Sequence, residues 1–145
     1  MTLRVLHVLD HSLPLHSGYT FRTASILREQ RKLGWETFHV TTPKQGVGTA
    51  LKEEADGWTF YRTPSTDQDG LVAQMRLTAA RLDELVREIK PDIIHPHSPV
   101  LNALPALWVG LLYDAEALDA AEALTSNWTY AEVRAMRDAV PEQGI

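Results

Sequence analysis

Two short apolar runs, each broken abruptly by polar or Pro residues, constrain the fold of this 145-residue chain more than any other feature. One covers residues 3–9, stops at Asp10 and leads into the loop 11–19, and the other lies within residues 91–99. Buried parallel strands have this pattern because both faces of their sheet are covered. Sites of α/β proteins lie at the edge where such strands end. The runs therefore predict a parallel α/β sheet with a site beside them.

The spacing of apolar residues predicts helices over residues 19–33 and 71–89. Gly34 is placed to end the first helix, since glycine readily adopts the left-handed conformation of a helix C-terminus. Asp67 or Asp69 is expected to cap the N-terminus of the second helix. A third helix is expected before a helical tail.

Alternating or short apolar segments predict the remaining strands over residues 35–41, 58–62 and 92–95. Residues 44–57 are expected to be a surface excursion. Strands that alternate with helices imply right-handed crossovers and a mostly parallel, Rossmann-like three-layer α/β domain. We predict the sheet order third, second, first, fourth, with residues 3–9 inside the sheet.

Composition excludes several classes of protein. The chain is 44% hydrophobic and 23% charged, which is typical of a soluble globular protein. It has no cysteine, so disulfides and thiolate metal sites are excluded. No apolar run approaches the roughly 20 residues of a transmembrane segment or forms a signal-peptide core, so a cytoplasmic location is expected. A net charge of -5 argues against a nucleic-acid partner.

Four histidines, His11, His16, His95 and His97, are expected near one crevice, because the first and fourth strands are neighbours in this topology. His97 is expected at the rim of the crevice. His95 faces the same side but is expected to lie deeper, as a hydrogen-bonded core histidine.

These histidines also suggest a zinc site, since imidazoles are common zinc ligands. Pro96 separates His95 from His97, and the only nearby carboxylates are those of Asp10 and Asp92. We therefore expect neither a metal ion nor a cofactor.

Gly18 lies in the turn that leads into the first predicted helix. Such a turn presents free N–H groups and the positive end of the helix dipole, which favour a phosphate or a carboxylate. The alternative is that Gly18 only permits the tight turn. The loop lacks a G-x-G-x-x-G pattern, so it is no dinucleotide fingerprint.

Residues 8–22, followed by 34–37 and 92–99, resemble the amino-terminal half of a retaining family 4 glycosyltransferase with the GT-B fold. The likeness is to bacterial members associated with exosortase A and exopolysaccharide export, and it covers about residues 1–110. The resemblance implies two Rossmann-like domains that face each other across a cleft. The first holds the acceptor, and the second binds a nucleotide-sugar through a Glu-x7-Glu motif.

The resemblance also implies roles for particular residues. His97 matches a histidine that contacts the transferred sugar, so it is the expected catalytic residue. Related enzymes usually have two adjacent glycines where this chain has Ser17 and Gly18. The expected substrate-binding residues are His16, Ser17, Gly18, Tyr19 and Ser98.

No pair of glutamates stands eight positions apart in the chain, and from residue 111 it departs from the family pattern. We therefore expect a domain over residues 1–110 and a helical tail over 111–145, with Ser126 and Asn127 capping a helix over 128–140. The chain is then the acceptor-side half of the enzyme and is not catalytic alone. In the full-length family the partners are a nucleotide-sugar donor and a glycan or lipid-linked acceptor; a separate carboxy-terminal half is a further expected partner. The alternative is a sugar- or anion-binding module without turnover, or an inert gene fragment.

Overall fold

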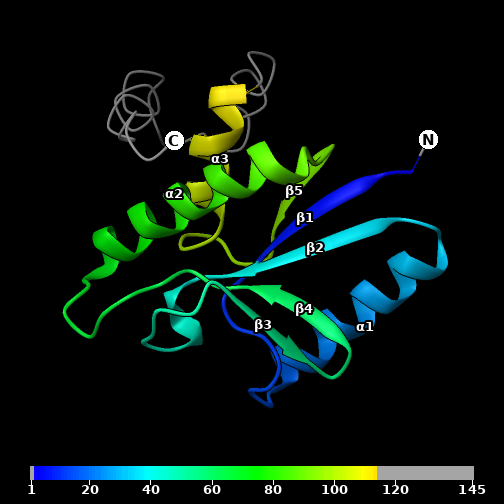
Figure 1. Ribbon diagram of the computed structural model, residues 1–145, viewed down its shortest axis with the longest axis horizontal. Helices are drawn as coiled ribbons and strands as arrows, with labels where there is room; N and C mark the ends of the chain where they lie inside the picture. Colours follow the sequence, from blue (N-terminus) through cyan, green and yellow to red (C-terminus); the bar gives the residue numbers. More distant parts are fainter. Residues whose placement is uncertain (1, 114–145) are drawn as a thin grey trace.

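The structure, a computed structural model, describes residues 2–113 and contains a five-stranded sheet in the order β3-β4-β2-β1-β5 (Figure 1). The elements in chain order are β1 (Arg4–Leu9), α1 (Gly18–Lys32), β2 (Glu36–Thr41), the 3-10 turn η1 (Pro43–Gln45), β3 (Lys52–Ala55), β4 (Trp58–Tyr61), α2 (Leu71–Ile89), β5 (Ile93–Pro96) and α3 (Ala103–Tyr113).

The sheet is mostly parallel. β1 lies between β2 and β5 and is parallel to both, and β2 is also parallel to β4. This arrangement confirms the predicted order of the four parallel strands. The domain is a Rossmann-like α/β domain.

The segment 44–57 is not only a surface excursion, because it contains β3, which pairs antiparallel with β4. Asp56 and Gly57 form the hairpin turn with φ angles of 55° and 79°. Both angles suit the two-residue turns that match the twist of a hairpin, and an Asp-Gly pair is a strong signal for such a turn. The turn signal is present in the sequence, but three of the four residues of β3 are charged, so the segment lacks the apolar pattern that predicts a strand.

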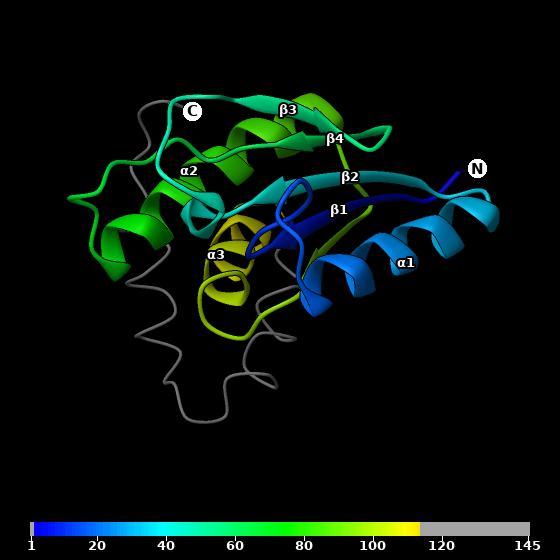
Figure 2. The same ribbon diagram turned by 90° about the horizontal axis from the view of Figure 1, so that it is seen from below.

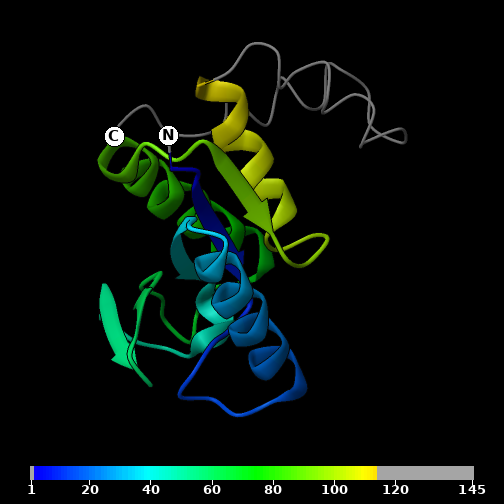
Figure 3. The same cartoon turned by 90° about the vertical axis from the view of Figure 1, so that its right-hand side faces the viewer.

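Helices cover both faces of the sheet. α2 and α3 pack on one face and α1 on the other (Figures 1 and 3). Figure 2 shows α1 running beside β1 and β2. Leu6 and Val8 of β1 belong to the core under α2 and α3, whereas Leu9 packs with Ala24 of α1. Burying each such aliphatic side chain stabilises the fold by roughly 1.5 to 3 kcal/mol.

The helix ends follow local chemistry. Ser17 caps α1, and its hydroxyl accepts a hydrogen bond of 3.1 Å from the backbone N–H of Thr20. Gly34 follows α1 with a φ of 84°, as predicted. The predicted aspartate cap of α2 is wrong: Gly70 occupies the cap position, without a side-chain cap hydrogen bond. The carboxylate of Asp69 does not cap the helix, because it accepts a hydrogen bond from the backbone N–H of Thr66 in the preceding turn.

α3 runs to Tyr113, across the proposed boundary between residues 110 and 111. Nearly all of the proposed tail, including its helix over 128–140, lies outside the described residues. Within residues 2–113, no helix is both long and apolar enough to cross a membrane.

Candidate functional site

The candidate site starts where β1 and β5 end side by side. The backbone N–H of His97 donates a hydrogen bond of 3.0 Å to the carbonyl oxygen of Val8. The side-chain Nδ2 of Asn102 donates to the same oxygen at 2.9 Å. Because Asn102 and Val8 are both fully buried, these bonds fix the segment after β5 against the end of β1.

The loop after β1 is tied to the start of α1 by side chains. The hydroxyl of Tyr19 accepts a hydrogen bond of 2.9 Å from the backbone N–H of Asp10. The ring of His11 stacks on that of Tyr19, with 4.9 Å between ring centroids, and its Nε2 lies 2.9 Å from the Ser17 hydroxyl. His16 is exposed and lies beside Phe21. The predicted residues 16–19 therefore form one connected turn at the N-terminus of α1.

Gly18 is exposed and its φ is not positive, and a Cβ added there would meet no atom within 4 Å. The turn itself therefore does not require glycine, which argues against the purely structural interpretation of Gly18. The N–H groups of Gly18 and Tyr19 precede the first intrahelical hydrogen bond, so they point out of the helix end. Gly18 is exposed and Tyr19 is half-buried, so this end of the helix faces solvent at Gly18.

Three histidines gather on the α1 side of the sheet. His7 of β1 lies opposite His95 of β5, and their ring centroids are 5.1 Å apart. The Nδ1 atom of His7 is 2.8 Å from Nε2 of His97, and the rings of His95 and His97 stack at 4.4 Å. The Nε2 atom of His7 donates to Oε1 of Gln30 on α1 at 2.7 Å. We call His7, His95 and His97 the histidine cluster.

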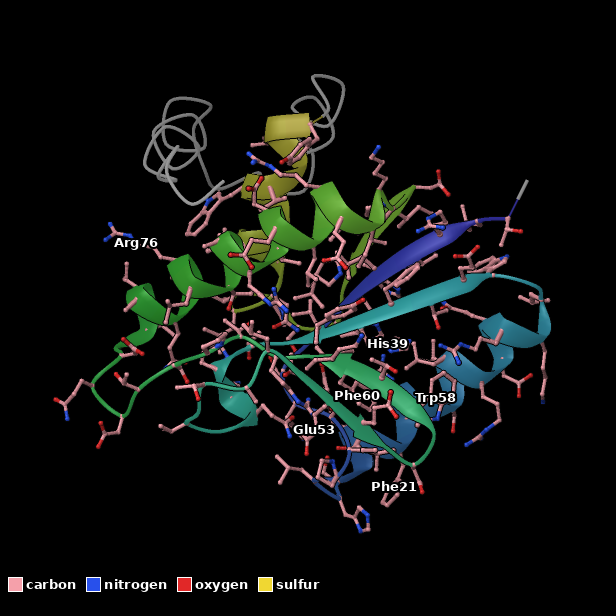
Figure 4. The ribbon with its side chains drawn as sticks, viewed as in Figure 1. Phe21, His39, Glu53, Trp58, Phe60 and Arg76 are labelled. Atoms are coloured by element: carbon pink, nitrogen blue, oxygen red, sulfur yellow. The ribbon has the colours of Figure 1, made fainter. Side chains whose placement is uncertain are left out.

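His39 of β2 continues this row of side chains but has a structural role. It lies opposite His7, its Nδ1 donates a hydrogen bond of 2.9 Å to the carbonyl of Thr59, and its Nε2 lies 2.9 Å from the Thr37 hydroxyl. Figure 4 shows it beside Trp58 and Phe60, whose rings lie 5.6 and 5.5 Å away. Both of its ring nitrogens are thus used within the fold.

Burial keeps these imidazoles neutral. It lowers the pKa of His7 to about 4, and that of His97 and of His39 to about 3. The pKa of His95 is lowered as well, first by the partial desolvation of its ring beside the other histidines and then by the positive charge of Arg22. The pKa of His97 is lowered mainly by burial, then by the neighbouring His95 and His7, and to a smaller extent by the positive charge of Arg22.

The prediction that His95 is a core histidine is wrong. Its side chain is exposed, whereas His97 is half-buried and His7 is fully buried. β5 is the outer strand of the described sheet, and α1 runs beside β1 and β2 instead of covering β5. The position of His95 before His97 in the chain therefore does not make it the more buried of the two.

His7 is a site residue that the apolar pattern of residues 3–9 did not indicate, because it lies within an otherwise apolar run. Strand alternation was the available signal: Leu6 and Val8 face α2 and α3, so His7 must face α1. Register then places it opposite His95.

Of the predicted residues, the structure joins His97 to His7 and His95, and it joins Ser17 and Tyr19 to His11. Ser98 is half-buried, and its carbonyl accepts from Ala103 at the start of α3.

Comparisons with known proteins give two kinds of match. Residues 17–140 match the model of the family described as Glycosyl transferase 4-like domain. A stretch of 45 residues is 53% identical to chloroplastic glutamate–cysteine ligase of Arabidopsis thaliana, 51% identical to chloroplastic glutamate–cysteine ligase A of Oryza sativa subsp. indica, and 44% identical to that of Solanum lycopersicum.

Each ligase match covers 31% of this chain but only 9% of the ligase, so the chain spans less than a tenth of the length of these relatives. No solved structure matches the chain significantly. The family model covers most of the sequence, and its fold class agrees with the parallel sheet described above. The chain belongs to the Glycosyl transferase 4-like domain family.

Proposed function

We propose that this chain is the acceptor-side half of a nucleotide-sugar-dependent retaining glycosyltransferase of bacterial exopolysaccharide biosynthesis, acting in the cytoplasm. Its partners are a nucleotide-sugar donor, a glycan or lipid-linked acceptor and a separate carboxy-terminal half that binds the donor. The 145-residue chain by itself does not transfer sugar. Family membership supports the reaction class.

One observation carries the proposal: β1 and β5 are adjacent parallel strands, so the turn that follows β1 and the segment that follows β5 leave the same edge of the sheet. The backbone N–H of His97 donates to the carbonyl oxygen of Val8 near the end of β1, which fixes the second segment at this edge. Both segments leave the C-terminal ends of these strands. In open α/β sheets this edge is where ligands bind.

The two segments offer complementary chemistry. The N–H groups of Gly18 and Tyr19 at the helix end suit an anionic group or a hydroxyl oxygen of the acceptor, and His16 and Ser17 border them. His97 is neutral at pH 7 because its pKa is lowered to about 3. A neutral imidazole can hydrogen bond to a sugar hydroxyl without repelling the positive charge that develops at the anomeric carbon. Ser98 adjoins it.

We further propose that residues 1–110 form this acceptor-side domain and that 111–145 are a helical tail. A second candidate function is binding of a sugar or an anion without turnover. The turn at Gly18 favours it, because anion binding at a helix N-terminus does not need a second domain.

Two measurements on the purified chain test the proposal. Ligand-observed NMR with monosaccharides and their 1-phosphates should show binding that His97→Ala and Gly18→Val weaken, while Arg76→Ala, on the exposed face of α2, leaves it unchanged. Calorimetry with nucleotide-sugars should show affinity no better than about millimolar, roughly -4 kcal/mol. Micromolar donor binding or measurable transfer by this chain would overturn the inactive-half assignment. Sugar binding that survives both site variants would overturn the site.

A further inference from the structure

We propose that the histidine cluster, His7, His95 and His97, binds a first-row divalent transition metal ion such as Zn²⁺. This goes beyond the proposed function, and no step of sugar transfer depends on it. The sequence alone led us to expect no metal ion, because the histidines considered there beside His95 and His97 were His11 and His16. The present proposal reverses that expectation. His7, on the neighbouring strand, supplies the third nitrogen.

The positions of the three ring nitrogens carry the inference. One nitrogen from each ring lies within 4.8 Å of the other two. Zn–N bonds of about 2.0 to 2.1 Å in a tetrahedral site place donor atoms about 3.4 Å apart. The Nδ1 of His7 and Nε2 of His97 are already 2.8 Å apart and must open slightly. The exposed His95 ring has freedom to close on them.

Gln30 prepares His7 for this role. The Nε2–H of His7 donates to the side-chain oxygen of Gln30 at 2.7 Å, so the lone pair of the neutral ring is on Nδ1, which faces His97. Histidine ligands commonly donate their second N–H to a carbonyl or a carboxylate, which fixes the tautomer and the ring orientation.

Without an ion, one N–H shared between the two nitrogens accounts for the contact between His7 and His97. When an ion binds there, the proton on Nε2 of His97 moves to Nδ1 of the same ring. Both rings stay neutral and no proton is released. Three neutral imidazoles suit zinc, copper and nickel better than magnesium or calcium, and water can fill the fourth position.

The positive charge of Arg22 should affect how tightly the histidine cluster binds a metal ion, and this effect can be measured. His7 is fully buried and His97 is half-buried, so bulk water competes little with an ion for their ring nitrogens. The guanidinium of Arg22, which acts on both His95 and His97, opposes a cation. Removing this charge should therefore strengthen metal binding, whereas an unspecific surface site would not respond to it.

The experiment uses the untagged chain, freed of metal by chelation. Calorimetry with ZnCl₂ should give one ion per chain. Titration with CoCl₂ should give visible absorption bands typical of tetrahedral Co²⁺. His95→Ala and His97→Ala should each weaken Zn²⁺ binding at least about tenfold, which is roughly 1.4 kcal/mol. Arg22→Gln should strengthen it at least about twofold, and the matched control His16→Ala should leave it unchanged.

His95 is exposed, so His95→Ala should fold normally, and circular dichroism of each variant checks this. Absence of Zn²⁺ binding would overturn the proposal. Undiminished binding in His95→Ala, or equal weakening in His16→Ala, would do the same, because the ion would then be held by other side chains. None of these measurements involves a sugar, so they can fail while the proposed function stands.

Discussion

The side chain of Asn102 donates a hydrogen bond of 2.9 Å to the carbonyl oxygen of Val8, although 94 positions separate the two residues in the sequence. Neither residue is exposed to solvent. The backbone N–H of His97 donates to the same oxygen. A buried amide thus fastens the turn that carries His97 to the central strand.

Asn102→Ala should lower the free energy of unfolding by about 1 to 3 kcal/mol, because it removes a buried hydrogen bond and leaves a cavity. Urea denaturation followed by circular dichroism measures the change. Gln68→Ala, in an exposed turn, serves as the control and should have little effect. An Asn102→Ala chain as stable as the parent would mean that the bond to Val8 contributes nothing.

Arg62 should be among the most sensitive positions for stability. Its buried guanidinium donates to the Ser12 hydroxyl at 2.7 Å, the Leu13 carbonyl at 2.9 Å and a carboxylate oxygen of Glu53 at 2.7 Å. Arg62→Lys cannot keep this planar set of donors, so we expect a loss of about 2 kcal/mol or more. Arg76, which points away from the fold in Figure 4, is the matched arginine, and Arg76→Ala should change stability by less than about 0.5 kcal/mol.

Stability should fall as the pH drops below about 6.5, where histidines of the unfolded chain become protonated. Burial lowers the pKa of His39 in the folded protein to about 3, so between these values the unfolded chain binds the extra proton. Protonation therefore favours unfolding by up to about 1.4 kcal/mol per pH unit for this residue. Urea midpoints between pH 8 and pH 4.5 measure the effect. His39→Gln should flatten the dependence, and an unchanged slope would contradict the assignment.

Gly18→Ala separates folding from binding. A Cβ at this position meets no atom of the chain within 4 Å, so stability should stay the same or rise by about 0.4 to 1 kcal/mol. Binding of sugar phosphates should weaken, since the methyl group stands at the exposed end of α1. Thermal unfolding and ligand-observed NMR on the same sample measure both. A large loss of stability would show that the glycine serves the fold after all.

His97→Ala in a full-length relative should lower turnover more than stability. His97 is only half-buried, so the main cost to stability is the loss of its hydrogen bond with His7, about 0.5 to 1.5 kcal/mol. Loss of a contact made in the transition state lowers kcat together with kcat/KM. Steady-state kinetics and a melting temperature compare the two effects. Unchanged kinetics in a correctly folded variant would remove His97 from the site.

The parallel sheet could be predicted because each of its four strands is a short or alternating apolar segment. The alternation of these strands with helices then predicts their order in the sheet. β3 could not be predicted, since its exposed edge tolerates charged residues and hides the alternation. The edges of the candidate site were predictable from where β1 and β5 end. The histidine cluster was not, because it depends on strand register, which aligns His7 with His95 and appears only when distant segments pair.

That long-range pairing also bears on how the chain matures during synthesis. β1 can pair with β2 once residue 41 has left the ribosome, but its second ladder, with Val5 opposite Ile93, needs the chain as far as Pro96. Contacts between such distant segments form slowly because a long loop must close first. The nascent protein therefore carries a half-paired central strand from the synthesis of residue 41 until that of Pro96, with one open edge that other chains or a chaperone can reach.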